Sequence, residues 1–251
     1  MSYIKPPFCR QGNKHIILKE IINEIPQHKI YCELFAGSAT LFFNKEKAQI
    51  NILNDLDKEV TDRLKLLKKA PLNKDLYNNF NNLNDIKNFY KNPHESIADK
   101  ILYYKIKACN GFNSVPVKKV EEIYKPDNPY SIVNNIDFYK NKLKNVKIFN
   151  KDYSLIIKQY DSNETFFFID PPYENTYKTF YNESQFDYEK LAYILKNIKG
   201  LFLLTLNDSK NIRNIFKDFI IKKINVKSQG WRNNNKHIVR KELFIMNYTL
   251  N

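Results

Sequence analysis

The segment Asp170–Pro171–Pro172–Tyr173 is the part of the sequence best suited to chemistry, and it directly follows the apolar run Thr165–Ile169. Proline has a fixed φ and no N–H group, so the two prolines stiffen the backbone and leave a carbonyl oxygen beside the carboxylate of Asp170. Such a pair of acceptors fits the hydrogens of an amino group, and Tyr173 adds a flat face on which a base can stack. The competing interpretation is a turn that ends a strand and buries a tyrosine.

A second group, Ala36–Ala39, places small side chains at a turn shortly after Glu33. Small residues let the backbone approach a ligand closely at the start of a helix. Asp55 comes about one strand–helix unit later, where an acidic residue commonly accepts hydrogen bonds from ribose hydroxyls. Neither GxGxxG nor GxxxxGK[ST] is present, so we expect a ligand with a ribose but no pyrophosphate at this turn. S-adenosylmethionine fits better than NAD or ATP, and a plain structural turn is the alternative.

Short apolar runs that are typical of buried strands would position these residues. Each of the first five is followed by a turn and a stretch of helical length, which predicts a mainly parallel sheet covered on both faces by helices. The last two predict a closing hairpin-like pair at one edge. The runs are Lys29–Glu33, Gln49–Asn54, Val146–Asn150, Thr165–Asp170, Gly200–Asn207, Phe219–Val226 and Glu242–Tyr248.

Four of the first five predicted strands end in polar residues that suit ligand binding. Their carboxyl ends carry Glu33, Asp55, Asp152 and Asp170 in turn. Open α/β sheets bind ligands outside the carboxyl ends of their strands. The sequence therefore predicts one site along this edge of the sheet.

The chain between the second and third predicted strands is too long for a simple crossover. It is rich in Lys, Asn and Tyr and has helical periodicity, for example at Ile101, Leu102 and Ile106. We expect an inserted, mostly helical subdomain over residues 58–144. Residues 1–57 and 145–251 would then form the domain that carries the sheet.

The chain is strongly basic, with 41 Lys and Arg residues against 27 Asp and Glu, a formal net charge of +14 and a pI near 9.4. Such an excess indicates a phosphate-rich partner. Seven basic residues and no acidic one fall between Lys222 and Lys241, with Trp231 and His237 among them. This run favours an edge that faces nucleic acid, and a lysine-rich composition without a binding role is the alternative.

The apolar runs are far shorter than the ~20 residues that span a bilayer, and the first residues lack the apolar stretch of a signal peptide. We therefore expect a cytoplasmic or otherwise intracellular protein, within the host cell if the source is viral, and a monomer. Cys9, Cys32 and Cys109 are widely spaced without a CxxC pair, so we expect reduced thiols and no disulfide framework or zinc site. The four histidines show no metal-ligand spacing, and no metal is expected.

These motifs resemble those of the Dam-like DNA adenine-6-amino methyltransferases, whose signature is DPPY. The resemblance covers nearly the whole chain and follows the family's alpha arrangement, with the cofactor motifs before the insertion and DPPY after it. Arg10 stands where the family has an aromatic residue, Asn13 replaces a glycine, and Ser38 and Ser114 lie where glycines are frequent. The matching segments are Gly12–Asn13–Lys14, Glu33–Leu34–Phe35–Ala36–Gly37, Asn54–Asp55–Leu56–Asp57, Gly111–Phe112–Asn113, Asp152–Tyr153, Asp170–Pro171–Pro172–Tyr173, Phe202–Asp208 and Glu242–Tyr248.

The resemblance implies a Rossmann-like class I S-adenosylmethionine-dependent methyltransferase sheet with an inserted, mostly helical target-recognition subdomain. It implies methyl transfer, without a metal, from S-adenosylmethionine to the 6-amino group of an adenine flipped out of double-stranded DNA at a specific site, as in restriction–modification systems. The catalytic residues would be Asp170, Pro171, Pro172 and Tyr173. The cofactor would contact Arg10, Lys14, Glu33, Phe35, Gly37, Ser38, Asp55, Asp152, Tyr153 and Asp170. DNA would contact Phe112, Asn113, Lys118, Lys119, Arg232 and Lys236.

Other classes of protein compete with this interpretation. A metal-dependent nuclease would also be basic and rich in carboxylates, but no glutamate in the chain has a lysine two residues later, as Glu-x-Lys sites require. A DNA-binding module that has lost catalysis is a second alternative, which the intact DPPY disfavours. An adenine methyltransferase that acts on RNA, or a protein glutamine methyltransferase, is a third, and the length and charge of the insertion favour DNA.

Overall fold

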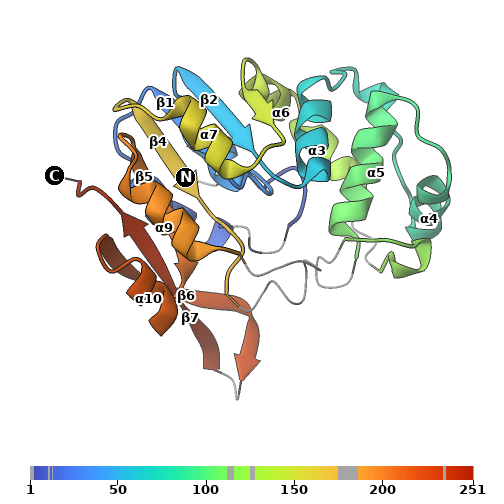
Figure 1. Cartoon of the computed structure of the whole chain (residues 1–251). Helices are drawn as coiled ribbons and strands as arrows, with labels where there is room; N and C mark the ends of the chain where they lie inside the picture. Colours follow the sequence, from blue (N-terminus) through green and yellow to red (C-terminus); the bar gives the residue numbers. More distant parts are fainter. Residues whose placement is uncertain are drawn as a thin grey trace. The chain divides into compact units, whose positions relative to one another are not determined.

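A computed structural model describes residues 3–10, 12, 14–111, 116–124, 128–174, 186–233 and 236–250, and for residues 227–240 it describes the backbone alone. Its strands form a seven-stranded sheet in the order β3-β2-β1-β4-β5-β7-β6 (Figure 1). The strands are β1 (Ile30–Glu33), β2 (Ile50–Asn54), β3 (Lys147–Phe149), β4 (Thr165–Ile169), β5 (Leu201–Asn207), β6 (Ile220–Asn233) and β7 (Lys236–Met246).

Helices occupy most of the chain between the strands. The α-helices are α1 (Leu18–Asn23), α2 (Thr40–Asn44), α3 (Lys58–Lys68), α4 (Leu83–Lys91), α5 (Ile97–Cys109), α6 (Ile136–Leu143), α7 (Tyr153–Tyr160), α9 (Tyr188–Lys196) and α10 (Lys210–Ile215). Short 3-10 helices are η1 (His15–Ile17), η2 (Lys74–Leu76), η4 (Val120–Glu122) and η5 (Pro129–Asn135).

The central strands of the sheet are parallel, as the sequence predicts. Strand β1 runs parallel to β2 and β4, and β4 runs parallel to β5, whereas β7 is antiparallel to both β5 and β6. The order differs from the doubly wound order 3-2-1-4-5-6 because β7 lies between β5 and β6. The predicted α/β fold with a Rossmann-like sheet is confirmed.

Strand β4 is buried along its whole length, which explains its continuous apolar sequence. Phe166 and Phe167 are completely buried, and neighbouring residues of a strand face opposite sides of the sheet. Helices α7 and α9 lie over one face of the sheet in Figure 1. Each begins at an aspartate, Asp152 or Asp187, whose carboxylate accepts a backbone N–H of the first turn. These caps fix where both helices start.

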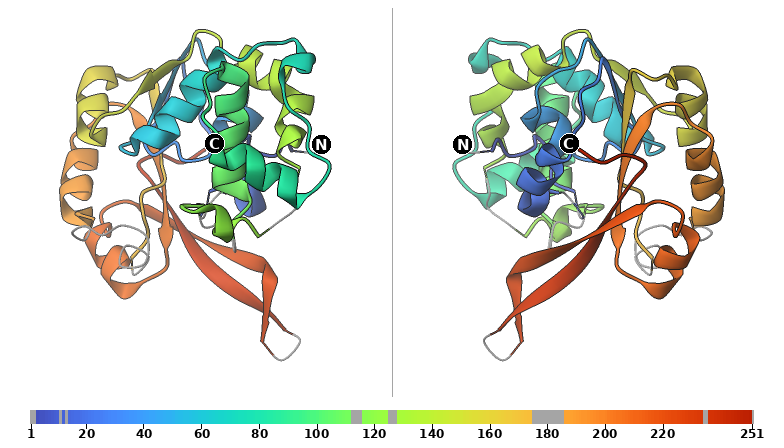
Figure 2. Two further views of the ribbon diagram at one scale, coloured as in Figure 1. Left: turned by 90° about the vertical axis from the view of Figure 1, so that its right-hand side faces the viewer. Right: turned by 90° about the vertical axis from the view of Figure 1, so that its left-hand side faces the viewer.

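Strands β6 and β7 are longer than the sequence indicates. Pairing continues from Ile220–Met246 to Asn233–Lys236, with a register shift between Lys227 and Arg232. Figure 2 shows the two strands continuing together as a long ribbon. Backbone pairing between antiparallel strands does not require apolar side chains, so the pairing continues beyond Val226, where the apolar pattern of the sequence ends.

Contacts divide the chain into two compact units. Unit 1 comprises Met1–His15, Gly37–Glu46 and Asp57–Asn150, and unit 2 comprises Ile16–Ala36, Lys47–Leu56 and Lys151–Asn251. Unit 1 contains helices α3 to α6, so the predicted helical character of residues 58–144 is present. The assignment of these residues to target recognition remains a prediction.

An ion-paired cluster holds α3 and α5 together inside unit 1. Glu59 pairs with Arg63 and with Lys107, the latter at 2.6 Å. The guanidinium of Arg63 also lies over the rings of Phe8 and Tyr104, at 5.7 and 5.4 Å from their centroids. The segment before residue 10 is therefore packed against the helices of this unit.

The cysteines differ from expectation. Cys9 and Cys109 form a disulfide, and Cys32 is free and buried. The prediction of three reduced thiols is wrong for this pair, because the fold brings together residues that are 100 positions apart in the sequence. Nearby, the ammonium of Lys105 donates to the carbonyl of Pro7 at 3.0 Å.

The described ranges contain neither a membrane-spanning helix nor a cluster of metal ligands. No helix there is both long and apolar enough for a membrane span. Within the same ranges, no three His, Cys, Asp or Glu side chains are grouped so that they could hold a metal ion.

Candidate active site

The Asp170 loop (Asp170–Glu174) follows the buried strand β4 and is held by side chains from neighbouring strands. The hydroxyl of Thr205 on β5 donates to Oδ1 of Asp170 at 2.7 Å. Thr205 is fully buried, at 0% exposure. The orientation of the Asp170 carboxylate is therefore set by a rigid neighbour, which the sequence did not single out.

The hydroxyl of Tyr173 anchors the loop to β7, the strand next to β5. This hydroxyl donates to Oε2 of Glu242 on β7 at 3.0 Å. Burial, followed by the negative charges of Asp170 and Glu242, raises the pKa of Tyr173 well above its ordinary value. The hydroxyl consequently keeps its proton and acts as a donor.

The rest of the loop has further partners. The hydroxyl of Tyr188 donates to the carbonyl of Pro172 at 2.6 Å, and the amide of Glu174 donates to Oδ1 of Asn207 at 3.2 Å. Among the described residues, no hydrogen bond is made to the carbonyl of Pro171. The two prolines thus differ, because one carbonyl is occupied and the other remains an acceptor beside Asp170.

Asn54 connects the carboxyl ends of neighbouring strands. Its amide nitrogen donates to the carbonyls of Leu34 and Lys151 at 3.0 and 2.9 Å, while its oxygen accepts the amide of Lys151 at 3.1 Å. The amide of Ala36 bonds to the carbonyl of Asn54 at 2.8 Å. The loops that carry Glu33, Asp55 and Asp152 are therefore tied to one edge of the sheet.

The carboxylates at this edge differ in their surroundings. Glu33 is almost completely buried, at 2% exposure, and accepts a hydrogen bond from the Tyr31 hydroxyl at 2.9 Å. Asp55 is also buried, but its neighbour Leu56 is 67% exposed. A buried Asp55 next to an exposed Leu56 suits a ligand that has both a polar sugar and a flat base. No role for Leu56 was predicted from the sequence.

An aromatic cluster surrounds Tyr153 at the start of α7. Its ring centroid lies 5.5 Å from that of Phe35 and 5.9 Å from that of Phe186. Burial and the nearby charges of Asp152 and Asp187 raise the pKa of Tyr153 to about 12. Its hydroxyl is buried and has no hydrogen-bond partner among the described residues. A buried donor without a partner costs about 1–3 kcal/mol, which a ligand atom could offset.

The predicted site residues of unit 1 surround the turn at Gly37. Gly37 has a positive φ of 50°, and a Cβ added there would lie 3.4 Å from Cδ of Arg10. Arg10 pairs with Asp57 at 2.9 Å. Burial opposes ionisation of Asp57, but the hydrogen bond and charge of Arg10 outweigh it and hold the pKa of Asp57 below its ordinary value.

Two more of the predicted cofactor-binding residues lie in unit 1, and each forms a hydrogen bond with a residue two positions away in the chain. The hydroxyl of Ser38 lies 2.7 Å from that of Thr40 at the start of α2. The buried ammonium of Lys14 donates to the carbonyl of Gly12 at 2.9 Å. Both contacts stabilise local turns.

The structure describes only some of the residues that are predicted to contact DNA. Lys118 and Lys119 are exposed, and both of their backbone amides donate to Oε2 of Glu122, at 2.6 and 3.3 Å. Phe112 and Asn113 lie outside the described residues. Arg232 and Lys236 lie on the β6–β7 ribbon, where only the backbone is described. All six assignments to DNA binding remain predictions.

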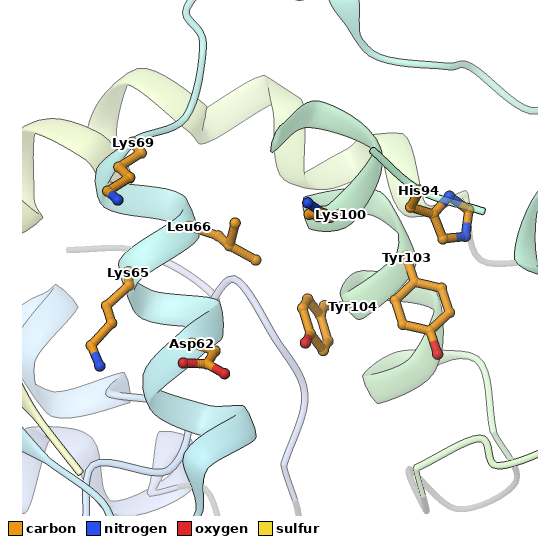
Figure 3. A pocket seen from close by; sticks show the side chains of 8 residues that line it. All are labelled: Asp62, Lys65, Leu66, Lys69, His94, Lys100, Tyr103 and Tyr104. Atoms are coloured by element: carbon orange, nitrogen blue, oxygen red, sulfur yellow. The ribbon is translucent and has the colours of Figure 1, made fainter. Parts of the chain in front are cut away.

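A pocket of about 450 Å³ lies between α3 and α5 in unit 1 (Figure 3). In this view Leu66 and Tyr104 point toward the space between the helices, whereas Lys65 and Lys69 extend from the opposite side of α3. The lysines do not converge on one point, so we assign no anion site here.

Comparison with known proteins shows the family to which the chain belongs. Residues 11–229 match the family described as D12 class N6 adenine-specific DNA methyltransferase. The chain is 26% identical over 238 residues to the type II methyltransferase M.CviBI of Paramecium bursaria Chlorella virus NC1A, a match that covers 86% of this chain and 88% of that protein. The solved structure of the putative methyltransferase yhhF from Escherichia coli is similar with a TM-score of 0.43 and 11% identity, over 98% of this chain and 92% of that one. The family match extends over most of the sequence, and the chain therefore belongs to the D12 class N6 adenine-specific DNA methyltransferases.

Proposed function

We propose that this adenine-specific DNA methyltransferase transfers a methyl group from S-adenosylmethionine to the 6-amino group of an adenine flipped out of double-stranded DNA at a specific site. The observation that carries the proposal is the pair of acceptors in the Asp170 loop. Thr205 orients the carboxylate of Asp170, and the adjacent Pro171 carbonyl lies next to it in the chain. The pair matches the two hydrogens of an amino group.

The chemical difficulty lies in the target nitrogen. The lone pair of the 6-amino group is delocalised into the ring, so the nitrogen is a weak nucleophile. Asp170 and the Pro171 carbonyl would accept hydrogen bonds from its two N–H groups and so help to localise the lone pair on the nitrogen. These interactions strengthen as positive charge develops on the nitrogen, and therefore stabilise the transition state more than the ground state. As the bond from nitrogen to the methyl group forms, the bond from the methyl group to sulfur breaks, and the methylated nitrogen then loses one proton to Asp170 or to water.

The residues of unit 2 at the carboxyl ends of its strands suit S-adenosylmethionine. This cofactor would supply the methyl group from its sulfonium. Asp55 would accept hydrogen bonds from its ribose, and Leu56 would cover one face of its base. The buried Tyr153 hydroxyl, which has no hydrogen-bond partner among the described residues, supports a polar ligand atom nearby. We carry Arg10, Lys14, Glu33, Phe35, Gly37, Ser38, Asp152 and Asp170 forward as further cofactor contacts.

An adenine inside a duplex cannot reach such a site, so the base must leave the stack at a cost of a few kcal/mol. Stacking on the ring of Tyr173, worth about 1–3 kcal/mol per base, would offset part of this cost. The basic run on the β6–β7 ribbon would add contacts to DNA phosphates that do not depend on sequence.

The test combines the protein with labelled S-adenosylmethionine and unmethylated genomic DNA, followed by sequencing that detects modified bases. We expect methyl groups on the 6-amino nitrogen of adenines within one short recurring sequence. Single-stranded DNA and RNA of matched sequence serve as controls. Labelling of cytosine, or stronger labelling of RNA than of duplex DNA, would contradict the proposal.

A further inference from the structure

A connected set of polar side chains joins β7 to the catalytic carboxylate. Glu242 accepts a hydrogen bond from the hydroxyl of Tyr173 at 3.0 Å, and the hydroxyl of Thr205 donates one to Asp170 at 2.7 Å. Thr205 and the charge of Asp170 also influence the Tyr173 hydroxyl. Two carboxylates therefore act on this hydroxyl, Glu242 through a hydrogen bond and Asp170 through its charge.

Each hydroxyl in this set has a single proton to donate. The proton of Tyr173 points to Glu242, and the proton of Thr205 points to Asp170. If Glu242 did not accept the hydrogen bond from Tyr173, the hydroxyl would turn toward Thr205 or Asp170, two other groups that act on it. A hydroxyl that donates to Asp170 would compete with the amino group that this carboxylate has to accept.

The backbone holds Glu242 firmly in place. Strand β7 lies between β5 and β6, and Glu242 is paired with Asn207 on one side and Ile224 on the other. The next residues toward the tip of the ribbon include the basic Lys241 and Arg240. Pairing on both sides fixes the face of the sheet to which the Cβ of Glu242 points, and this places its carboxylate to orient another group.

We propose that Glu242 is a positioning residue for methyl transfer, which holds the Tyr173 hydroxyl proton away from Asp170 and fixes the tyrosine ring for the target base. The inference rests on the proposed function, because it concerns the same acceptor pair. Glu242 itself touches neither substrate nor cofactor in this scheme. Its effect passes through Tyr173.

The test is a set of four proteins: the wild type, Glu242→Ala, Tyr173→Phe and the double variant. Single-turnover rates are measured on duplex DNA with both substrates saturating. Glu242→Ala should lower the rate about tenfold or more, the effect of one misdirected hydrogen bond to a charged group, while KM for DNA changes much less. The double variant should be faster than Glu242→Ala and should match Tyr173→Phe, because phenylalanine has no hydroxyl that can turn toward Asp170.

Two further variants separate positioning from simple structural support. Glu242→Gln retains an oxygen that accepts the tyrosine proton and should be faster than Glu242→Ala. Glu189→Ala removes an exposed glutamate from the first turn of α9 and controls for the loss of a negative charge. The proposal is overturned if the double variant is as slow as Glu242→Ala, or if Glu242→Ala and Glu189→Ala leave the rate equally unchanged.

The design also separates this inference from the proposed function. An active wild type whose Glu242→Ala variant is not rescued by Tyr173→Phe refutes the positioning role alone. A folded wild type that transfers no methyl group to adenine refutes both. Urea unfolding of the same four proteins tests the hydrogen bond without turnover, and we expect the two single changes to be non-additive. Strict additivity would show that the pair does not interact and would overturn the proposal.

Discussion

Replacing Thr205 by valine removes the donor to Asp170 and keeps a similar shape in a fully buried place. The hydrogen bond is 2.7 Å long and has a carboxylate as its acceptor. Bonds of this kind are worth about 1.5–3 kcal/mol. If the whole of this energy serves to orient Asp170 in the transition state, the rate of methyl transfer falls about ten- to hundredfold, since each 1.36 kcal/mol corresponds to a factor of about ten.

The assay for Thr205→Val is single-turnover methyl transfer with saturating S-adenosylmethionine and duplex DNA, together with circular dichroism to confirm folding. Thr205→Ser keeps the hydroxyl and serves as the matched control, and its rate should lie closer to that of the wild type. Because both substrates are saturating, a change in cofactor affinity, measured separately by calorimetry, does not affect the comparison of rates. A folded Thr205→Val protein that methylates as fast as the wild type would refute the idea that this hydrogen bond orients Asp170.

Three other predictions concern the cofactor, the ribbon and the response to acid. Asp55→Ala should weaken S-adenosylmethionine binding, measured by calorimetry, more than DNA binding, and equal losses would contradict a ribose contact. Arg232→Ala should weaken binding to all duplexes alike and reduce the salt slope by about one unit, whereas Asn113→Ala should lower methylation of the preferred site and leave the slope intact. The depressed pKa of Asp57 contributes stability above the ordinary aspartate pKa of about 3.9, and this stability is lost as pH falls through the lower folded value. Asp57→Asn should therefore make the free energy of unfolding less dependent on pH below about 4, and an unchanged acid limb in urea titrations would contradict the ion pair with Arg10.

Much of the fold follows from local features of the sequence. Mostly apolar runs predict the parallel strands, because such strands are buried on both faces. The position of the Asp170 loop is also predictable, since the run that becomes β4 ends at two prolines. Residues 58–144 have helical periodicity, and the structure contains helices there.

Contacts between distant segments could not be predicted in the same way. The bonds from Thr205 to Asp170 and from Tyr173 to Glu242 depend on which strands are neighbours and on their register. The pairing of Cys9 with Cys109 depends on where the first residues pack against α5. The extension of β6 and β7 depends on backbone pairing, which leaves no apolar pattern in the sequence.

In the proposed reaction, the Asp170 carboxylate accepts a hydrogen bond from the adenine amino group during methyl transfer. The most direct test of this role is nucleoside mass spectrometry of duplex DNA after incubation with S-adenosylmethionine and either the wild type or Asp170→Ala, with folding and DNA affinity checked for both. We expect N6-methyladenine from the wild type and none above background from a folded Asp170→Ala protein that still binds DNA. Substantial N6-methyladenine from that variant would contradict it.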